Sequence, residues 1–288
     1  MITRPNLWLI VATITVVVSI AIIVLVKPLW GIDFIGGSLL EVQGDNLSTD
    51  IITSELATLN LGATIQTTDT GSFLIRTIPL NPTTHDKVTE ALKAKSPTFE
   101  ELRYESIGPT IGEELRRKAW IAIIMSVVVM IAYLAYEFRH MGGLISPWKY
   151  GVAATVALVH DLVFVTAIFV ILGRTHNVPI DTLFVTAMLA VFGYSANDTI
   201  VLFNRMKYEW LGTRTGSLIT IMDRSAQAIL IRSLNISIAI LLTLIILLFF
   251  GGPTIYWFIV ALTIGTIVGT YSTIFVAPPF LYLLSKKR

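Results

Sequence analysis

Residues 182–203 read TLFVTAMLAVFGYSANDTIVLF, a stretch of membrane-spanning length that nevertheless contains a carboxylate, Asp198. A helix rises about 1.5 Å per residue, so roughly 20 residues cross about 30 Å of hydrocarbon. A second carboxylate, Asp161, lies well inside another apolar stretch, whereas every other acidic residue falls in a polar segment or at the edge of an apolar one. A carboxylate in hydrocarbon is costly unless it is paired, protonated or hydrated, so both are expected to be functional and to move an ion or proton.

The composition of the whole chain indicates a membrane protein. Of its 288 residues, 54% are hydrophobic and 14% are charged, with a mean hydropathy of +0.75. Soluble domains average about 25% charged residues. The net charge of +2 does not favour nucleic-acid binding. There is no cysteine, the histidines are not spaced as ligand pairs and no nucleotide motif is present, so neither a metal nor a cofactor is expected.

Six apolar stretches are long enough to be membrane-spanning helices. They lie at 7–26, 119–137, 150–172, 182–203, 229–250 and 254–284. The first is too long for a signal peptide and has no cleavage site, so it is expected to be an uncleaved anchor. Pro278-Pro279 are expected to kink or end the last helix, because proline lacks the N–H that a helix interior uses.

The segment 31–115, between the first two spans, is the one sizeable polar region of the sequence. Its pattern predicts strands at 38–43, 63–68, 72–78 and 98–106 and helices at 49–61 and 81–95. Ser48 or Thr49 suits the N-cap of the first helix, and Pro82 suits the first turn of the second. The order βαββαβ predicts a small ferredoxin-like α+β domain. The chain is therefore divided into 1–30 (tail and first span), 31–115, and 116–288 (the other spans).

Basic residues at the ends of the spans predict the orientation in the membrane, because Lys and Arg are enriched on the cytoplasmic side. One side carries eleven: Arg4, Arg139, Lys149, Arg205, Lys207, Arg214, Arg224, Arg232, Lys286, Lys287 and Arg288. The other carries five: Lys27, Arg116, Arg117, Lys118 and Arg174. Both termini are therefore predicted to be cytoplasmic and 31–115 extracytoplasmic. The 116–118 cluster opposes this but follows a long translocated domain, where the rule weakens.

Residues near 214–230 carry apolar side chains at helical spacing, among them Leu218, Met222 and Ala226. This pattern predicts an amphipathic helix on the cytoplasmic membrane surface, leading into the fifth span. A solvated loop helix is the alternative.

Three charged residues are the candidates for ion movement. Asp198 lies about 10 Å from the cytoplasmic surface and Asp161 about 16 Å, counted along their helices. Arg232 near the start of the fifth span has a similar depth to Asp198, and an ion pair between them would keep Asp198 ionised. Asp161 has no evident partner in the sequence. The alternatives are that all three are static polar contacts between helices, or that Arg232 extends to the lipid headgroups.

Small and polar residues surround Asp198. Tyr194, Asn197 and Thr199 can hydrogen-bond across a helix interface, and small residues allow close approach of helices. The last span contains Gly265 and Gly269, a small-xxx-small pattern that by itself is weak.

Five motifs are spread along the chain. They are Gly31–Gly37 (GIDFIGG), Ile107–Gly112 (IGPTIG), His160-Asp161, Gly193–Val201 (GYSANDTIV) and Ile231–Ser233 (IRS). Their order resembles that of the SecD/SecF protein-export family, and the resemblance covers essentially the whole chain. Residue 196 is Ala where the family usually has Ile, and the family's Ser before the arginine is absent here.

The resemblance implies a six-span bundle of the RND superfamily in a bacterial inner membrane, paired with a SecD-like subunit. It implies a non-enzymatic accessory role beside the SecYEG channel and a YajC-like protein, in contact with membrane lipid. In that role the protein would use the proton-motive force to promote late steps in the export of unfolded polypeptide. Family relay residues would correspond to Asp198 and Arg232, with Asp161 as a neighbour. The glycines of 31–37 are expected to form a turn from the first span into a strand, in preference to a proton entrance at Asp33.

Other functions remain open at this point. A proton-coupled RND-type exporter of small molecules or lipids is the nearest, although its outer domains are usually larger than the about 85 residues of 31–115. An intramembrane aspartyl protease is disfavoured, because Asp161 and Asp198 differ in expected depth and no Gly-x-Gly-Asp sequence is present. A non-transporting scaffold would leave the intramembrane acids without a role.

Overall fold

The structure is a computed structural model that describes residues 4–68, 71–139, 145–213 and 217–286. It forms two compact units. The first comprises Met1–Lys27, Ile121–Ile171 and Leu183–Arg288, and the second comprises Pro28–Trp120 and Leu172–Thr182. Several predicted features lie outside the described residues: residues 69–70 between the second and third predicted strands, the first residues of the 214–230 helix, and Arg214, Lys287 and Arg288.

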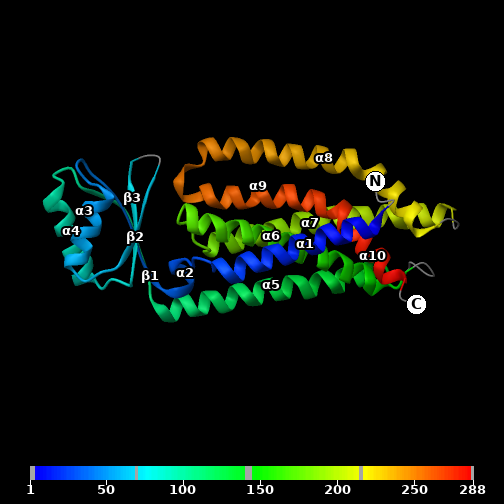
Figure 1. Ribbon diagram of the computed structural model, residues 1–288, viewed down its shortest axis with the longest axis horizontal. Helices are drawn as coiled ribbons and strands as arrows, with labels where there is room; N and C mark the ends of the chain where they lie inside the picture. The colour runs from blue at the N-terminus through cyan, green and yellow to red at the C-terminus, as the bar shows by residue number, and fades with distance from the viewer. Residues whose placement is uncertain (1–3, 69–70, 140–144, 214–216, 287–288) are drawn as a thin grey trace. The chain divides into compact units, whose positions relative to one another are not determined.

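Long apolar helices make up most of the described chain (Figure 1). They are α1 (Pro5–Val26), α5 (Pro109–Glu137), α6 (Pro147–Thr175), α7 (Thr182–Thr213), α8 (Leu218–Phe250), α9 (Gly252–Phe275) and α10 (Ala277–Lys286). With α9 and α10 taken together, the described residues contain 6 helices long and apolar enough to cross a membrane. All the predicted spans are therefore confirmed, and the chain is a multi-pass membrane protein.

The last span is broken where its prolines predict. Helix α9 ends at Phe275, Val276 is its C-cap, and α10 begins at Ala277. Pro278 and Pro279 lie in the first turn of α10, where the missing N–H has no helical partner to lose.

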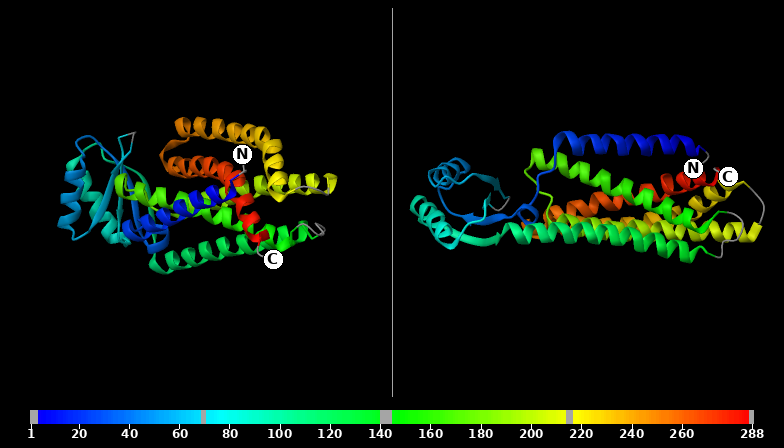
Figure 2. Two further views of the ribbon diagram at one scale, coloured as in Figure 1. Left: turned by 45° about the vertical axis from the view of Figure 1, so that its right-hand side comes forward. Right: turned by 90° about the horizontal axis from the view of Figure 1, so that it is seen from below.

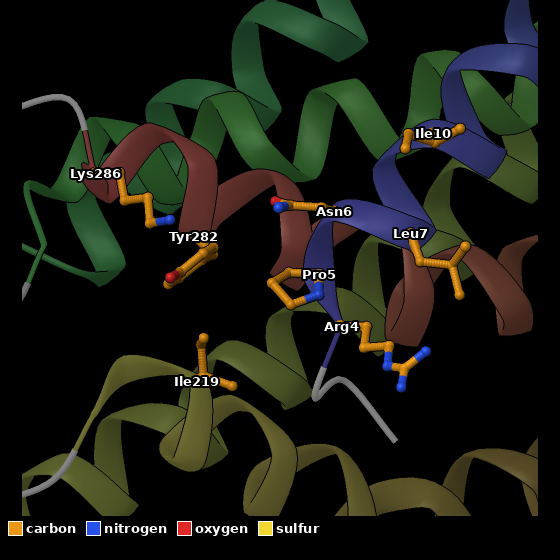
Figure 3. Close-up of a pocket in the computed structure, with 8 residues that line it drawn as sticks. All are labelled: Arg4, Pro5, Asn6, Leu7, Ile10, Ile219, Tyr282 and Lys286. Carbon is orange, nitrogen blue, oxygen red and sulfur yellow. The ribbon is translucent and has the colours of Figure 1, made fainter.

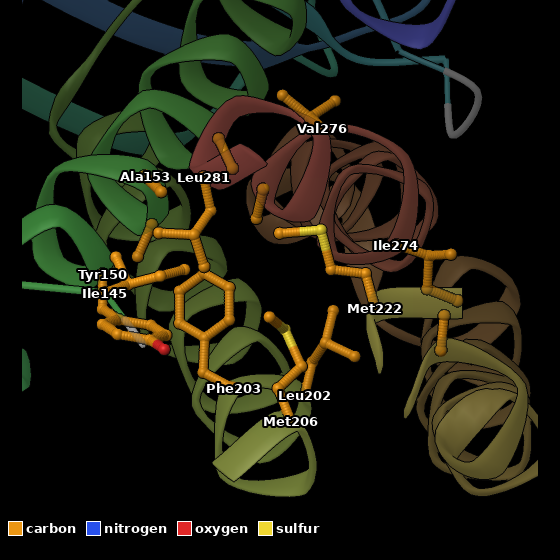
Figure 4. Packing of buried hydrophobic residues seen from close by; sticks show 14 of the residues in the cluster. Ile145, Tyr150, Ala153, Leu202, Phe203, Met206, Met222, Ile274, Val276 and Leu281 are labelled. Atoms are coloured by element: carbon orange, nitrogen blue, oxygen red, sulfur yellow. The ribbon is translucent and has the colours of Figure 1, made fainter. Parts of the chain in front are cut away.

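The predicted amphipathic helix near 214–230 is not a separate element. Its described residues form the first turns of α8, which begins at Leu218 after an N-cap at Ser217 and is continuous to Phe250. Figure 2 shows α8 changing direction after these turns. The predicted helical spacing is therefore confirmed for the described residues, and the apolar side packs into a protein core (Figure 4). Residues of this core include Met222, Ala226, Ile229, Leu202, Met206, Ile274 and Leu281.

The spans differ in how much of them the rest of the structure covers. The apolar parts of α6, α7 and the last span are half buried, whereas those of α1, α5 and α8 are mostly exposed. An apolar helix that its own protein leaves uncovered in a membrane faces lipid or another subunit. The interior of the first unit is therefore built around α6, α7 and α9, of which α6 carries Asp161 and α7 carries Asp198.

The second unit contains a four-stranded antiparallel sheet in the order β2-β3-β1-β4. In chain order its elements are β1 (Gly37–Gln43), α3 (Thr49–Thr58), β2 (Ala63–Thr67), β3 (Phe73–Thr77), α4 (Pro82–Lys95) and β4 (Glu100–Ile107). This is the predicted succession of strands and helices. Ser48 caps α3 by accepting a hydrogen bond from Ile51 N, and Pro82 opens α4. The core between sheet and helices includes Leu40, Ile52, Leu56, Ile75, Val88 and Leu92.

Candidate functional site

Asp161 lies on α6 with 1% of its surface exposed, and its carboxylate is held by two other helices. Its Oδ2 accepts hydrogen bonds from Ser195 Oγ of α7 (2.8 Å) and Ser272 Oγ of α9 (2.7 Å). Its Oδ1 lies 3.0 Å from His160 Nδ1. The expectation that Asp161 lacks a partner in this chain is therefore wrong. Sequence reasoning missed Ser272 because a serine more than a hundred positions away gives no local sign that it will meet this carboxylate.

Asp198 lies on α7, is 4% exposed, and accepts a hydrogen bond at Oδ2 from Ser233 Oγ of α8. Within the described chain it forms no ion pair with Arg232, whose side chain is exposed. Adjacent side chains on a helix point about 100° apart, so Ser233 and Arg232 cannot both face Asp198 in one orientation of α8. The expected ion pair between Asp198 and Arg232 is therefore not formed, and Asp198 is hydrogen-bonded to Ser233 instead.

Hydroxyl groups extend this polar interior between α7, α8 and α9. The hydroxyl of Tyr194 lies 2.5 Å from Ser237 Oγ and 3.1 Å from Thr270 Oγ1. Ser237 Oγ also donates to the carbonyl of Ser233, the partner of Asp198. Tyr194 thus joins the three helices one turn from the Asp198 contact.

Thr199 and Asn197 differ in placement although both flank Asp198. Thr199 is fully buried, donates to the carbonyl of Ser195 (3.0 Å) and lies 3.4 Å from Thr273 Oγ1 of α9. Asn197 is exposed and forms no hydrogen bond to another helix within the described residues. The structure therefore brings Thr199 into the interface and leaves Asn197 on the outer surface of the unit.

Glycines of α9 allow it to approach α7 closely enough for these bonds. A Cβ at Gly265 would lie 2.2 Å from Val191 Cγ2, and one at Gly269 would lie 3.1 Å from Ser195 Cβ. Residues four apart lie on the same face of a helix, so both glycines face α7. This contact gives the small-xxx-small pattern a structural role, since it carries Ser272 to within reach of Asp161.

Two buried polar atoms beside Asp161 have no partner within the described residues: His160 Nε2 and Tyr271 Oη. Their ring centroids are 6.1 Å apart, and the Tyr271 ring stacks on Phe275 at 5.6 Å. Buried polar atoms are nearly always hydrogen-bonded, to protein or to ordered water. The side of Asp161 nearest His160 therefore holds two buried polar atoms that a proton donor, a proton acceptor or an ordered water could bond.

In the second unit, the two glycine motifs pack against each other. Residues 32–35 form a short helix, α2, and Gly36 turns the chain into β1 with φ +77°, so the predicted turn is present. A Cβ at Gly36 would lie 2.9 Å from Pro109 Cα, and one at Gly112 would lie 2.9 Å from Gly36 N. Asp33 Oδ2 accepts a hydrogen bond from Thr182 N (2.8 Å), the first residue of α7. Asp33 thus serves as a helix cap supplied from a distant segment.

The loop between α6 and α7 is attached to this same unit. Ile180 and the 29–31 segment exchange backbone hydrogen bonds of 2.7 and 2.8 Å, and Gln66 of β2 donates to the carbonyl of His176. Arg76 of β3 donates to Gln66 Oε1 (2.8 Å). Burial lowers the pKa of the Arg76 guanidinium, and the carboxylate of Asp181 acts in the opposite direction. The helices that carry Asp161 and Asp198 are thus joined to the sheet through 172–182.

Comparison with known proteins identifies the family. Residues 87–287 match the model of the C-terminal region of the protein export membrane protein SecD/SecF. Among curated proteins, the chain is 37% identical over 259 residues to a protein translocase subunit SecF of Thermobaculum terrenum, covering 85% of this chain and 81% of the relative. It is 30% identical to one of Helicobacter pylori, covering 97% and 85%.

Solved structures give the same picture. The crystal structure of SecDF from Thermus thermophilus, a translocon-associated membrane protein, matches with a TM-score of 0.85 at 27% identity, over 96% of this chain and 37% of that chain. SecDF in a super-membrane-facing form matches with a TM-score of 0.67 at 26% identity, over 98% and 37%. The chain thus spans about 37% of the length of the solved SecDF chains. It belongs to the SecD/SecF family of protein-export membrane proteins.

Proposed function

We propose that this chain is the SecF-type accessory subunit of a Sec translocase, and that with a SecD-like partner it uses the proton-motive force to promote late steps of protein export. Support comes from relatives named as translocase subunit SecF that align over more than four-fifths of their length. The match to solved SecDF supports a SecD-like partner. The other proposed partners are the SecYEG channel, a YajC-like protein and the unfolded polypeptide.

One observation carries the proton-coupled part of the proposal: each buried carboxylate accepts hydrogen bonds from a helix other than its own. A hydrogen bond to an ionised group is roughly twice as strong as one between neutral groups. Protonation of Asp161 or Asp198 therefore weakens a contact between helices, and loss of the proton restores it. One charge that crosses a potential of 100 mV is worth about 2.3 kcal/mol, enough to bias a two-state bundle.

Arg232 is the proposed second partner of Asp198. In this structure Ser233 Oγ donates a hydrogen bond to the Asp198 carboxylate, and Arg232, the preceding residue on α8, is exposed. Rotation of α8 about its own axis would exchange the serine for the guanidinium. An ionised Asp198 favours the arginine and a protonated one favours the serine, so the two partners define the two states of the relay.

Asp161 is proposed to exchange its proton through His160. The imidazole contacts Asp161 Oδ1 through Nδ1, while Nε2 on its far side has no partner in the described chain. An imidazole can take a proton on one nitrogen and release one from the other, and Tyr271 lies beside it as a further hydroxyl. The route thus enters from the α9 side of the His160 ring.

The second unit is proposed to be a ferredoxin-like extracytoplasmic domain, corresponding to residues 31–115, with both termini of the chain in the cytoplasm of a bacterial cell. Its antiparallel strand order and its βαββαβ succession support the ferredoxin-like assignment. Loop 172–182 and the Asp33 cap connect its sheet to the helices that bear the acids. Movement of α6 or α7 on protonation would thereby reach the domain that handles the exported chain.

The rival functions lack such support. A shared proton between two aspartates would require a direct contact, and each carboxylate here has serine partners of its own. For an RND-type small-molecule exporter, the cavities of about 460 and 240 Å³ beside α1 are lined by neither Asp161 nor Asp198.

Two experiments test the proposal separately. Copurification of a six-span SecD-like subunit with the tagged chain tests the accessory role; recovery of the chain alone would contradict it. For the relay, Asp161→Asn, Asp198→Asn and Arg232→Met are each assembled with the partner, and export into vesicles is measured with the proton or the sodium gradient collapsed.

We expect each variant to lose the gradient-dependent part of export and to keep the gradient-independent part. The matched control is Asp86→Asn, at a side chain that is 75% exposed in the second unit. Full gradient-dependent export by all three variants would refute the relay while leaving the accessory role intact.

A further inference from the structure

A cavity of about 460 Å³ lies where the first turns of α1 meet α8 and α10 in the first unit. Its volume is within the about 300–1,000 Å³ typical of small-molecule sites. The beginning of α1 and the end of α10 lie at the same end of the helices (Figures 1 and 2). Its walls are made by Arg4, Pro5, Asn6, Leu7, Ile10, Ile219, Tyr282 and Lys286.

The polar groups of this cavity are all cationic or neutral. Figure 3 shows the Lys286 ammonium and the Asn6 amide directed into the space between α10 and α1, with Arg4 at the far end and its guanidinium directed away from Lys286. The ammonium lies 4.9 Å from the centre of the Tyr282 ring. No carboxylate lines the cavity, and neither cation has an ion-pair partner in the described chain. Two unneutralised cations around one space favour an anion.

The backbone of α1 adds to this preference. The helix begins with Pro5 after Arg4, and no side chain caps it. Pro5 has no N–H and Leu7 N donates to the Arg4 carbonyl (3.1 Å), so among the described residues of this turn the Asn6 N–H is the backbone donor left for a phosphate oxygen. The anion is therefore expected at the Arg4–Asn6 turn and at Lys286.

An apolar groove continues from the cavity along α1. It has a volume of about 240 Å³, is lined by Leu9, Ile10, Thr13 and Ile14, and shares Ile10 with the cavity. Ile10 and Ile14 are 56% and 57% exposed, on a helix that crosses the membrane. Residue 14 lies about 15 Å along the axis from residue 4. A cationic, polar head followed by an apolar groove in the membrane matches an amphiphile, and a free anion would leave the groove uncovered.

We propose that the cavity between α1, α8 and α10 binds the headgroup of an anionic phospholipid, with one acyl chain lying along Leu9–Ile14. The phosphate is held by Lys286, Asn6 and the first turn of α1, and Arg4 contributes its charge from the other side. Lipid in this position joins α1, which the protein itself covers little, to α10 and the start of α8. Helix α8 also carries Ser233 and Arg232 of the proposed relay, three to four turns after Ile219.

Native mass spectrometry of the purified full chain tests this, with phosphatidylglycerol, phosphatidylcholine of the same acyl chains, and inorganic phosphate as probes. We expect phosphatidylglycerol to remain bound in preference to phosphatidylcholine, and inorganic phosphate neither to bind nor to compete. A cation near a membrane surface contributes roughly fivefold in affinity for anionic lipid, so Arg4→Gln with Lys286→Gln should weaken binding about 5- to 25-fold.

The matched control is Arg139→Gln with Arg224→Gln, which removes the same charge from two exposed positions outside the cavity and should retain the lipid. Arg4→Lys with Lys286→Arg should also retain it, which separates loss of charge from loss of fold. The proposal would be overturned if the test and control pairs lost lipid equally, or if the two lipids were retained equally. Competition by phosphate, or displacement of the lipid by the SecD-like subunit, would also overturn it.

Discussion

The contact between Gly265 and Val191 makes a sharp prediction about the packing that supports Asp161. Gly265→Ala places a methyl group 2.2 Å from Val191 Cγ2 and 2.8 Å from Cγ1. Ordinary van der Waals contact begins at 3.4 Å, so the two helices must separate by 1.2 Å (3.4 minus 2.2) unless Val191 rearranges. Val191 is buried, which leaves it little room to do so.

Two opposing contributions determine how much Gly265→Ala changes the free energy of unfolding. Overpacking destabilises a protein by about 1–3 kcal/mol, whereas replacing glycine by alanine inside a helix stabilises it by about 0.5–1 kcal/mol. With two methyl groups in the clash, we expect a net destabilisation of about 2 kcal/mol. Ser272 is two turns from Gly265, so the same shift would lengthen its 2.7 Å bond to Asp161 and reduce gradient-dependent export.

The assay is unfolding of the full chain in mixed detergent micelles, followed by circular dichroism, for Gly265→Ala, Val191→Ala and the double variant. Val191→Ala removes both clashing methyl groups, so the double variant should recover stability, with a coupling energy of about 1–3 kcal/mol. Gly193→Ala on α7 is the control, because a Cβ there meets nothing within 4 Å. Additive effects within about 0.5 kcal/mol, or equal destabilisation by Gly193→Ala, would refute the reasoning.

Three further predictions concern the junction and the relay. Asp33→Ala should lower the free energy of unfolding by about 1 kcal/mol and speed amide hydrogen exchange in the first turn of α7. Asp33→Asn should have a smaller effect, because asparagine can still cap the helix. Equal exchange rates in the two variants would argue against capping. Gly36→Ala should destabilise the chain by about 2–4 kcal/mol and Gly71→Ala by only about 1–2 kcal/mol in the same unfolding assay, because both have positive φ but only Gly36 also meets backbone. Ser233→Ala should lower gradient-dependent export by disturbing Asp198 while copurification of the SecD-like subunit is unchanged; an unaffected rate would remove Ser233 from the relay.

Local sequence determined the elements of this protein. The spans follow from apolar length, since the bilayer leaves the backbone no partner but its own helix. The strands and helices of the second unit follow from alternation and from caps such as Ser48 and Pro82. The break before Pro278 follows from a missing N–H. In each case the decisive interaction lies within a few residues along the chain.

The partners of the buried acids were decided by tertiary structure alone. Depth along each helix predicted Arg232 as the partner of Asp198, but α8 is oriented so that Ser233 donates to this carboxylate. The spacing of residues within α8 does not determine which face of the helix contacts α7. The same holds for Ser272 at Asp161 and for Thr182 at Asp33, where the two groups are 111 and 149 positions apart. The sequence alone could thus name the carboxylates that need a partner, because their cost in hydrocarbon is local. It could not name the hydroxyls that meet them, because Ser233 depends on the rotation of α8 and Ser272 on how close Gly265 and Gly269 allow α9 to come to α7.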